Sequence, residues 1–311
     1  LKLNLDPANY NFTSGFTSYE KLQTSKNSDR YQFVLPYYDY STSVFSNYKG
    51  AMNFSSSGDN TLSNTNNLKS IISNNLTYQV NDIYSKFGFV SNYAIHLKNL
   101  NSIAKNDTRY KSSLQSEILN INEFNVSYPL LKENKKNYDY LTPKISFRIN
   151  PSNMKDHSSN GSLITTDNVF SINRLGLSES FESGKSLTFG LDYRKENKND
   201  INKFFEVKLA SILRDTPEYK IPYASSLQGK SSNLFGSIES KFLDHLTFNY
   251  DFLIDNNFNT FEHNNFKTEY KVNNFITEFH FHESNGKVGA SNYFSNETAF
   301  NFDDNNSLIF K

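Results

Sequence analysis

Apolar and polar residues alternate along much of the chain, in segments of about ten residues. Residues 187–193 place four apolar side chains on one face, and Thr188, Gly190 and Asp192 on the other. Further alternating runs occupy residues 145–149, 205–209, 246–252 and 275–281. Because successive side chains of a β-strand point to opposite faces, this period predicts strands with one apolar face and one polar face.

The strand-like runs recur about every 18 to 22 residues, which suits long membrane strands with loops better than the shorter rhythm of a soluble sandwich. Roughly 15 strands fit into the chain at that spacing. An open soluble sheet of that size would expose long edges and wide faces, whereas a closed barrel has no edge and gives its apolar face to lipid. We therefore expect an all-β fold: part of a large antiparallel transmembrane β-barrel whose polar face lines a wet lumen.

Polar segments separate the alternating runs and are predicted to be loops or strand tips; they include residues 55–60, 132–137 and 194–200. Pro36 and Pro143 are expected close to strand starts, because proline cannot donate a hydrogen bond within a sheet. No break in composition marks a linker, so residues 1–311 are expected to form one domain. We interpret both ends as cuts within a longer protein, since the chain opens without Met and closes on a strand-like run.

Composition narrows the function classes. Aromatic residues make up 15% of the chain, with 28 Phe and 20 Tyr, which is too many for a disordered protein. Lys and Arg number 32 and are balanced by 32 Asp and Glu, so no basic field indicates nucleic-acid binding. The absence of cysteine from the sequence excludes disulfides and thiolate zinc sites within it. No apolar run approaches the ~20 residues of a membrane helix.

Candidate chemistry is sparse. His280 and His282 would share one face of a strand and could chelate a metal, but a third ligand is not evident, so we interpret them as lumen-facing polar residues. The oxygen-rich run 303–306 lacks the ligand spacing of a calcium loop and is predicted to be a hairpin loop. No serine, histidine and carboxylate grouping is recognisable, so we expect no catalytic residue, no cofactor and no enzymatic activity.

Three stretches of the chain form a recognisable series. Residues 29–40 pass through Leu35–Pro36 into an aromatic stretch, and residues 140–148 contain a Pro143–Lys144 strand. The third and most specific stretch has a Phe-Ser-x-Asn-Arg core with glycines after it, here Phe170, Ser171, Asn173, Arg174, Gly184 and Gly190. Together and in this order, the three stretches resemble the barrel domain of the lipopolysaccharide-assembly family LptD. The resemblance runs from Arg30 to Phe302, and it departs from the family pattern at Ile172, where an Asp is common.

This resemblance implies an outer-membrane translocon that inserts lipopolysaccharide into the outer leaflet of the outer membrane. The partners it implies are lipopolysaccharide, membrane lipid, an LptE-like lipoprotein plug, and an LptA-like periplasmic bridge reached through an N-terminal jellyroll domain. The family-motif residues, Pro36 and Pro143 included, are expected to be structural or lumen-facing. Arg174, taken as a strand residue, would cost ~2–4 kcal/mol facing lipid at mid-bilayer, so we expect it to face the lumen in an ion pair. The glycines are expected to permit bends or close approach.

Two alternatives stay open. The chain could belong to another outer-membrane transport barrel, either a porin or a TonB-dependent receptor, which would share the alternating strands. It could also be a secreted β-sandwich adhesin, since a soluble sandwich has the same period. A sandwich would stay folded without detergent, whereas a membrane barrel would not.

Overall fold

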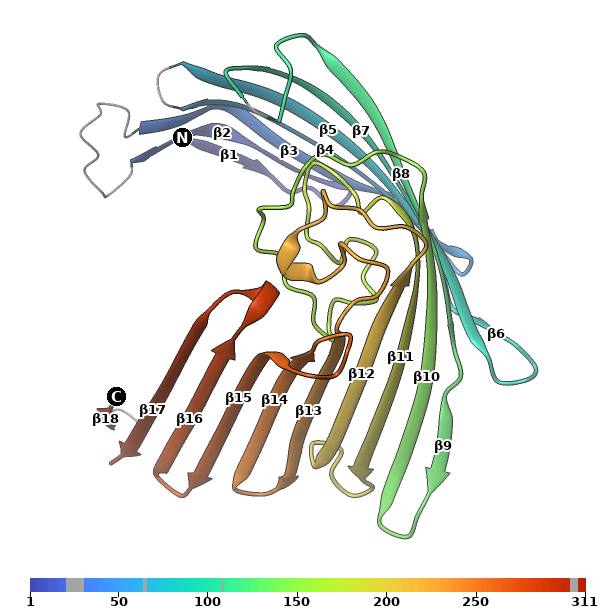
Figure 1. Ribbon diagram of the computed structural model, residues 1–311, viewed down its shortest axis with the longest axis vertical. Coiled ribbons are helices and arrows are strands. Elements are labelled where there is room, and N and C mark those ends of the chain that lie inside the picture. The colour runs from blue at the N-terminus through green and yellow to red at the C-terminus, as the bar shows by residue number, and fades with distance from the viewer. Residues whose placement is uncertain (21–30, 64–65, 108, 303–306) are drawn as a thin grey trace.

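The computed structural model describes residues 1–20, 31–63, 66–107, 109–302 and 307–311. Its strands form a single sheet of 18 strands that curves into a broad arc (Figure 1). The strands are β1 (Lys2–Leu5), β2 (Tyr10–Glu20), β3 (Tyr31–Asn47), β4 (Gly50–Ser63), β5 (Asn67–Val80), β6 (Ile83–Tyr84), β7 (Val90–Lys105), β8 (Gln115–Ser127), β9 (Leu130–Glu133), β10 (Asn137–Asn150), β11 (Gly184–Asn197), β12 (Phe204–Arg214), β13 (Leu234–Leu243), β14 (Leu246–Ile254), β15 (Phe261–Val272), β16 (Phe275–Ser284), β17 (Ser291–Asn301) and β18 (Ser307–Phe310). Two short 3₁₀ helices are η1 (Tyr223–Ser225) and η2 (Gly286–Val288).

The sheet is an antiparallel meander, in which each strand, apart from the short β6 and β9, pairs with the next such strand along the chain. Two short strands prolong longer ones: β6 pairs with β7 as β5 does, and β9 pairs with β10 as β8 does. The break between β8 and β9 lies beside Pro143, whose missing N–H interrupts the ladder, although its carbonyl accepts a bond from the Tyr128 amide at 3.0 Å.

The structure confirms an all-β antiparallel fold and corrects two details. The expected count of roughly 15 strands is wrong, because the sheet has 18, including the short β6 and β9. Closure into a barrel is not seen either. Within the described residues, β1 pairs with β2 and β18 with β17, and the sheet stays open between its first and last strands (Figure 1).

Several sequence-based boundaries also need correction. Pro36 and Pro143 lie well inside β3 and β10 rather than near their starts. Pro36 is tolerated there because the register shifts between Val34 and Tyr37, so no ladder bond is required of it. Residues 55–60, predicted to be a loop or strand tip, form the middle of β4, whereas residues 194–197 form the end of β11 and are a strand tip, as predicted.

The alternation gives the sheet two different faces. Leu141, Ile145 and Phe147 of β10 are exposed on the convex face. Ser146 and Arg148, between and after them on the same strand, are buried on the concave face. No helix in the part of the chain that the structure describes is long and apolar enough to cross a membrane.

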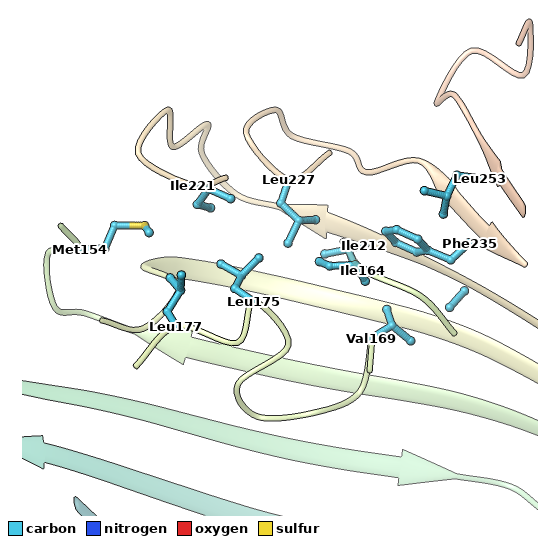
Figure 2. Close-up of a cluster of buried hydrophobic side chains, with 11 residues drawn as sticks. Met154, Ile164, Val169, Leu175, Leu177, Ile212, Ile221, Leu227, Phe235 and Leu253 are labelled. Atoms are coloured by element: carbon cyan, nitrogen blue, oxygen red, sulfur yellow. The ribbon is translucent and has the colours of Figure 1, made fainter. Parts of the chain in front are cut away.

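The core lies between the concave face and two long connections, residues 151–183 and 215–233, which fill part of the concavity in Figure 1. Figure 2 shows how the apolar side chains of these connections meet those of the sheet. The cluster comprises Met154, Ile164, Val169, Leu175 and Leu177 of the first connection, Ile221 and Leu227 of the second, and Ala210, Ile212, Phe235 and Leu253 of β12–β14. Folding therefore buries apolar surface inside the arc although the convex apolar face stays open.

Candidate functional site: the connection docked in the concave face

Five charged side chains form a buried cluster where the connection 151–183 meets the sheet. Arg174 donates to Glu182 through two nitrogens, Nε and Nη2, each 2.6 Å from a carboxylate oxygen. Glu182 also receives bonds from Arg148 of β10, at 3.4 Å, and from Arg214 at the end of β12. Arg148 in turn pairs with Glu123 of β8. None of the five side chains is more than 4% exposed, so the cluster is shielded from water.

Neutral groups satisfy several further donors of the cluster, although the buried Nε of Arg214 has no hydrogen-bond partner among the described residues. Arg174 donates to the hydroxyls of Thr188 and Ser186 on β11, both at 2.9 Å. Arg148 reaches the carbonyl of Ser171, and Arg214 reaches that of Ser183 at 2.7 Å. Buried charges are costly unless they are paired and hydrogen-bonded. The connection supplies the Glu182 carboxylate and the two carbonyls, so it must stay docked for the buried arginines of the sheet to keep these partners.

The cluster sets the protonation of its central carboxylate. Burial by itself raises the pKa of Glu182, but the guanidinium groups of Arg174, Arg148 and Arg214 outweigh burial and hold that pKa at about 2. Burial lowers the pKa of Arg174 to about 10, with the charge of Arg148 contributing. Both groups are therefore charged at neutral pH, and the connection carries a permanent ion pair.

The motif stretch from Phe170 to Arg174 lies in turns rather than in a strand, so the strand expected around Arg174 is wrong. Asn173 closes one turn, since its side-chain amide donates to the Leu177 carbonyl at 3.1 Å and its oxygen accepts from the Leu177 amide at 3.3 Å. Gly176 completes the turn at φ +64°, a conformation that favours glycine. This turn aims Arg174 into the cluster.

Glycines mark where the connection meets β11. A Cβ added at Gly190 would lie 2.5 Å from the Phe170 ring, so the ring rests directly on this glycine. Gly184 begins β11 at φ +85°, again in the left-handed region. Phe170 and Gly190 belong to the same sequence motif, and the structure shows that they are also neighbours in space.

A second anchor joins the same connection to strands in the N-terminal half of the sheet. Glu179 forms an ion pair with Lys69 of β5 at 3.4 Å and accepts a hydrogen bond from the Tyr110 hydroxyl. Lys98 of β7 donates to the Ser178 carbonyl, and the Phe181 ring lies 4.5 Å from the His96 ring. The connection therefore bridges the concavity from β5 to the C-terminal strands.

The two histidines singled out in the sequence lie on the concave face of β16. His280 is hydrogen-bonded to Asn265 at 2.7 Å, and His282 to Ser284 at 3.1 Å. Among the described residues, no group of three or more candidate ligands is arranged to hold a metal ion. The run 303–306, considered for calcium, lies outside the described residues.

The structure groups residues that the sequence did not bring together. Arg174 was a candidate, but Glu182, Glu123, Arg148 and Arg214 come from distant positions whose pairing no spacing rule indicates. Arg148 lies at an alternating, concave-facing position of β10, and that is the only sequence signal it offered.

Comparison with known protein families and with curated proteins finds no match for this chain.

Proposed function

We propose that this chain is the barrel domain of an LptD-like outer-membrane translocon that inserts lipopolysaccharide into the outer leaflet. One observation carries the proposal: a single curved sheet has an apolar, exposed convex face and a polar concave face partly filled by its own connections. That division matches a wall between lipid and a wet lumen.

The convex face is rich in aromatic side chains. Phe248 and Phe266 meet edge to face with ring centroids 5.1 Å apart, and Phe279 and Phe294 lie 6.2 Å apart. Phe279 and Phe294 are 39% and 66% exposed, on neighbouring strands. So broad an exposed apolar surface is unfavourable in water and favourable against acyl chains.

The LptD-like motif supports the finer part of the proposal, because its most specific stretch, Phe170 to Arg174, lies in the docked connection and Phe170 rests on Gly190 of β11. In this function the acyl chains of lipopolysaccharide pass along the membrane side and its sugars pass on the concave side. An LptE-like lipoprotein would occupy the rest of the lumen, and an LptA-like bridge would deliver lipid through an N-terminal domain. No bond is made or broken.

Depletion of the full-length protein tests the proposal. We expect lipopolysaccharide to accumulate in the periplasm or inner membrane, while other outer-membrane barrels still assemble. The measurement is surface labelling of lipopolysaccharide alongside fractionation of the two membranes. Normal surface lipopolysaccharide after depletion would reject the assembly function, and a loss of small-solute uptake in its place would favour a porin or a TonB-dependent receptor.

A further inference from the structure

A hollow of about 510 Å³ opens beside strands β2–β5, next to the turn between β1 and β2. Its volume falls within the range of about 300–1,000 Å³ that is usual for small-molecule sites. The turn at its rim is fastened by a 2.8 Å hydrogen bond from the Thr42 hydroxyl to the Asn9 carbonyl. The hollow is separate from the charged cluster around Glu182.

Neutral hydrogen-bonding side chains line this hollow. Neighbouring positions across four strands are Asn11, Ser41, Ser55 and Asn75, and the next row adds Asn53 and Thr77. These positions share the concave face, because Ser73 and Ile71, on the same side of β5, are buried there. Among the residues lining the hollow, Asp6 alone carries a carboxylate, and none is Lys or Arg.

Asn75, in the polar row of the hollow, is only loosely engaged by the side chains beside it. The Asn75 amide lies 3.4 Å from the Ser55 hydroxyl, and its oxygen lies 3.4 Å from His96 Nε2. Both distances are beyond the usual 2.7–3.2 Å range of a good hydrogen bond. These groups retain the capacity to bond a ligand at better geometry.

The part of the concave face beyond β7 and β8 has a different character. On β10–β12 it carries ion pairs, among them Lys144 with Asp192 and Lys208 with Glu206, the latter at 2.9 Å. The lining of the hollow is neutral apart from Asp6, and Lys98 of β7, which pairs opposite Asn75, is 4% exposed and donates to the Ser178 carbonyl. An anionic ligand would favour cationic side chains, whereas a polyol offers donors and acceptors that match amides and hydroxyls.

We infer that the hollow at β2–β5 is a binding site for an uncharged stretch of saccharide. The inference rests on the proposed function for the source of that ligand, which is then the neutral sugars of lipopolysaccharide and not its phosphorylated part. The site would hold successive sugars weakly through Asn53, Ser55 and Asn75, as a step along the concave face.

The test uses the purified full chain in detergent micelles, with maltoheptaose as the uncharged probe and binding followed by saturation-transfer NMR. Asn75→Leu removes the central amide, and Asn249→Leu makes the same change on the concave face of β14, outside the hollow. We expect Asn75→Leu to weaken maltoheptaose binding by about tenfold, and Asn249→Leu to leave it within about twofold. Ser55→Ala gives a milder second variant should Asn75→Leu not fold.

Failure of the wild-type chain to bind maltoheptaose would overturn the site, as would equal loss in both leucine variants. The two proposals fail separately. Saccharide binding that depends on Asn75, combined with normal surface lipopolysaccharide after depletion, would keep the site and reject the assembly function. Absence of saccharide binding, with lipopolysaccharide retained inside the cell, would reject only the site.

Discussion

Glu182 joins three guanidinium groups that come from three different parts of the chain: the connection 151–183, β10 and the end of β12. A buried ion pair contributes little net stability compared with apolar packing, but removing one partner leaves charges stranded in a medium of low polarity. The cluster therefore specifies where the connection docks more than it adds to the total free energy of folding.

The substitution Glu182→Gln is expected to lower the free energy of unfolding by ~3–5 kcal/mol. It leaves Glu123 as the one carboxylate in a cluster with three buried arginines. Urea unfolding in micelles measures this loss of stability. The matched control is Glu239→Gln, whose partner Lys241 lies 2.8 Å away in a partly exposed pair. That change should cost less than ~1 kcal/mol. Equal effects of the two variants would contradict the role given to the cluster.

The same carboxylate predicts an acid limit. Its pKa is lowered from 4.5 to about 2 in the folded chain. Because the folded value is the lower one, the stabilisation is complete above the unfolded pKa and is lost as pH falls through the folded pKa. Thermal melts should show the wild-type melting temperature falling toward that of Glu182→Gln as pH drops from 4.5 to about 2. If the melting temperatures of the two proteins stay the same distance apart over that pH interval, Glu182 is not the group that sets the acid limit.

Gly190 offers a steric test of the docked connection. Ala at this position would place its Cβ 2.5 Å from the Phe170 ring, so the ring and the turn that carries it must move. We expect Gly190→Ala to speed proteolytic cleavage within residues 151–183. Gly161→Ala is the control, because a Cβ there meets nothing within 4 Å. Unchanged cleavage in Gly190→Ala would show that Phe170 does not hold the connection in place.

The sequence indicated some residues of the charged cluster and the docked connection, and not others. The motif identified Arg174 and Gly190, and an arginine in a predicted membrane protein needs a partner away from lipid. Its partner Glu182 lies only eight positions away, yet alternation, which assumes a strand, could not identify it. The turn made by Asn173 and Gly176 depends on a local hydrogen bond that the alternating pattern does not report.

At the level of elements, alternation predicted the two-faced strands correctly and failed where side chains are uniformly polar. Residues 55–60 were expected to be a loop or strand tip because Ser, Gly, Asp and Asn favour turns. They form the middle of β4 because hydroxyls and amides bond across strands: Ser56 donates to Asn74 at 2.7 Å, and Asn74 to Asn99 at 3.3 Å. Pairing with neighbours overrides local preference in a sheet.

The strands also define a test of the membrane-facing side. Leu191 of β11 is 40% exposed on the convex face. Leu191→Lys would place a charge against lipid and should cost ~2–4 kcal/mol if it lies near mid-bilayer. Asn249→Lys, on the concave face of β14, should be tolerated, because the proposed function makes that face wet. Folding into lipid vesicles, followed by band shift on gels, separates the two; equal insertion would reject the orientation.

For the whole molecule, the exposed convex face and the open sheet edges predict behaviour in solution. Unpaired edge strands and wide apolar faces both promote aggregation in water. The purified chain should be monodisperse in micelles and should aggregate when detergent is removed, as light scattering can follow. A stable monomer in plain buffer would favour the secreted sandwich.

The openness of the sheet was not predictable, because period and spacing carry no information on whether the first and last strands meet.

The bridging connection also has a consequence for the order of folding. Hairpins of a meander join neighbouring stretches of chain and can form early, whereas the pair of Lys69 and Glu179 closes a loop of 110 positions. Closing so long a loop is entropically unfavourable until the intervening hairpins have shortened it. The arc should therefore form first and acquire its fixed curvature last, when Glu179 reaches β5 and ties the two halves together.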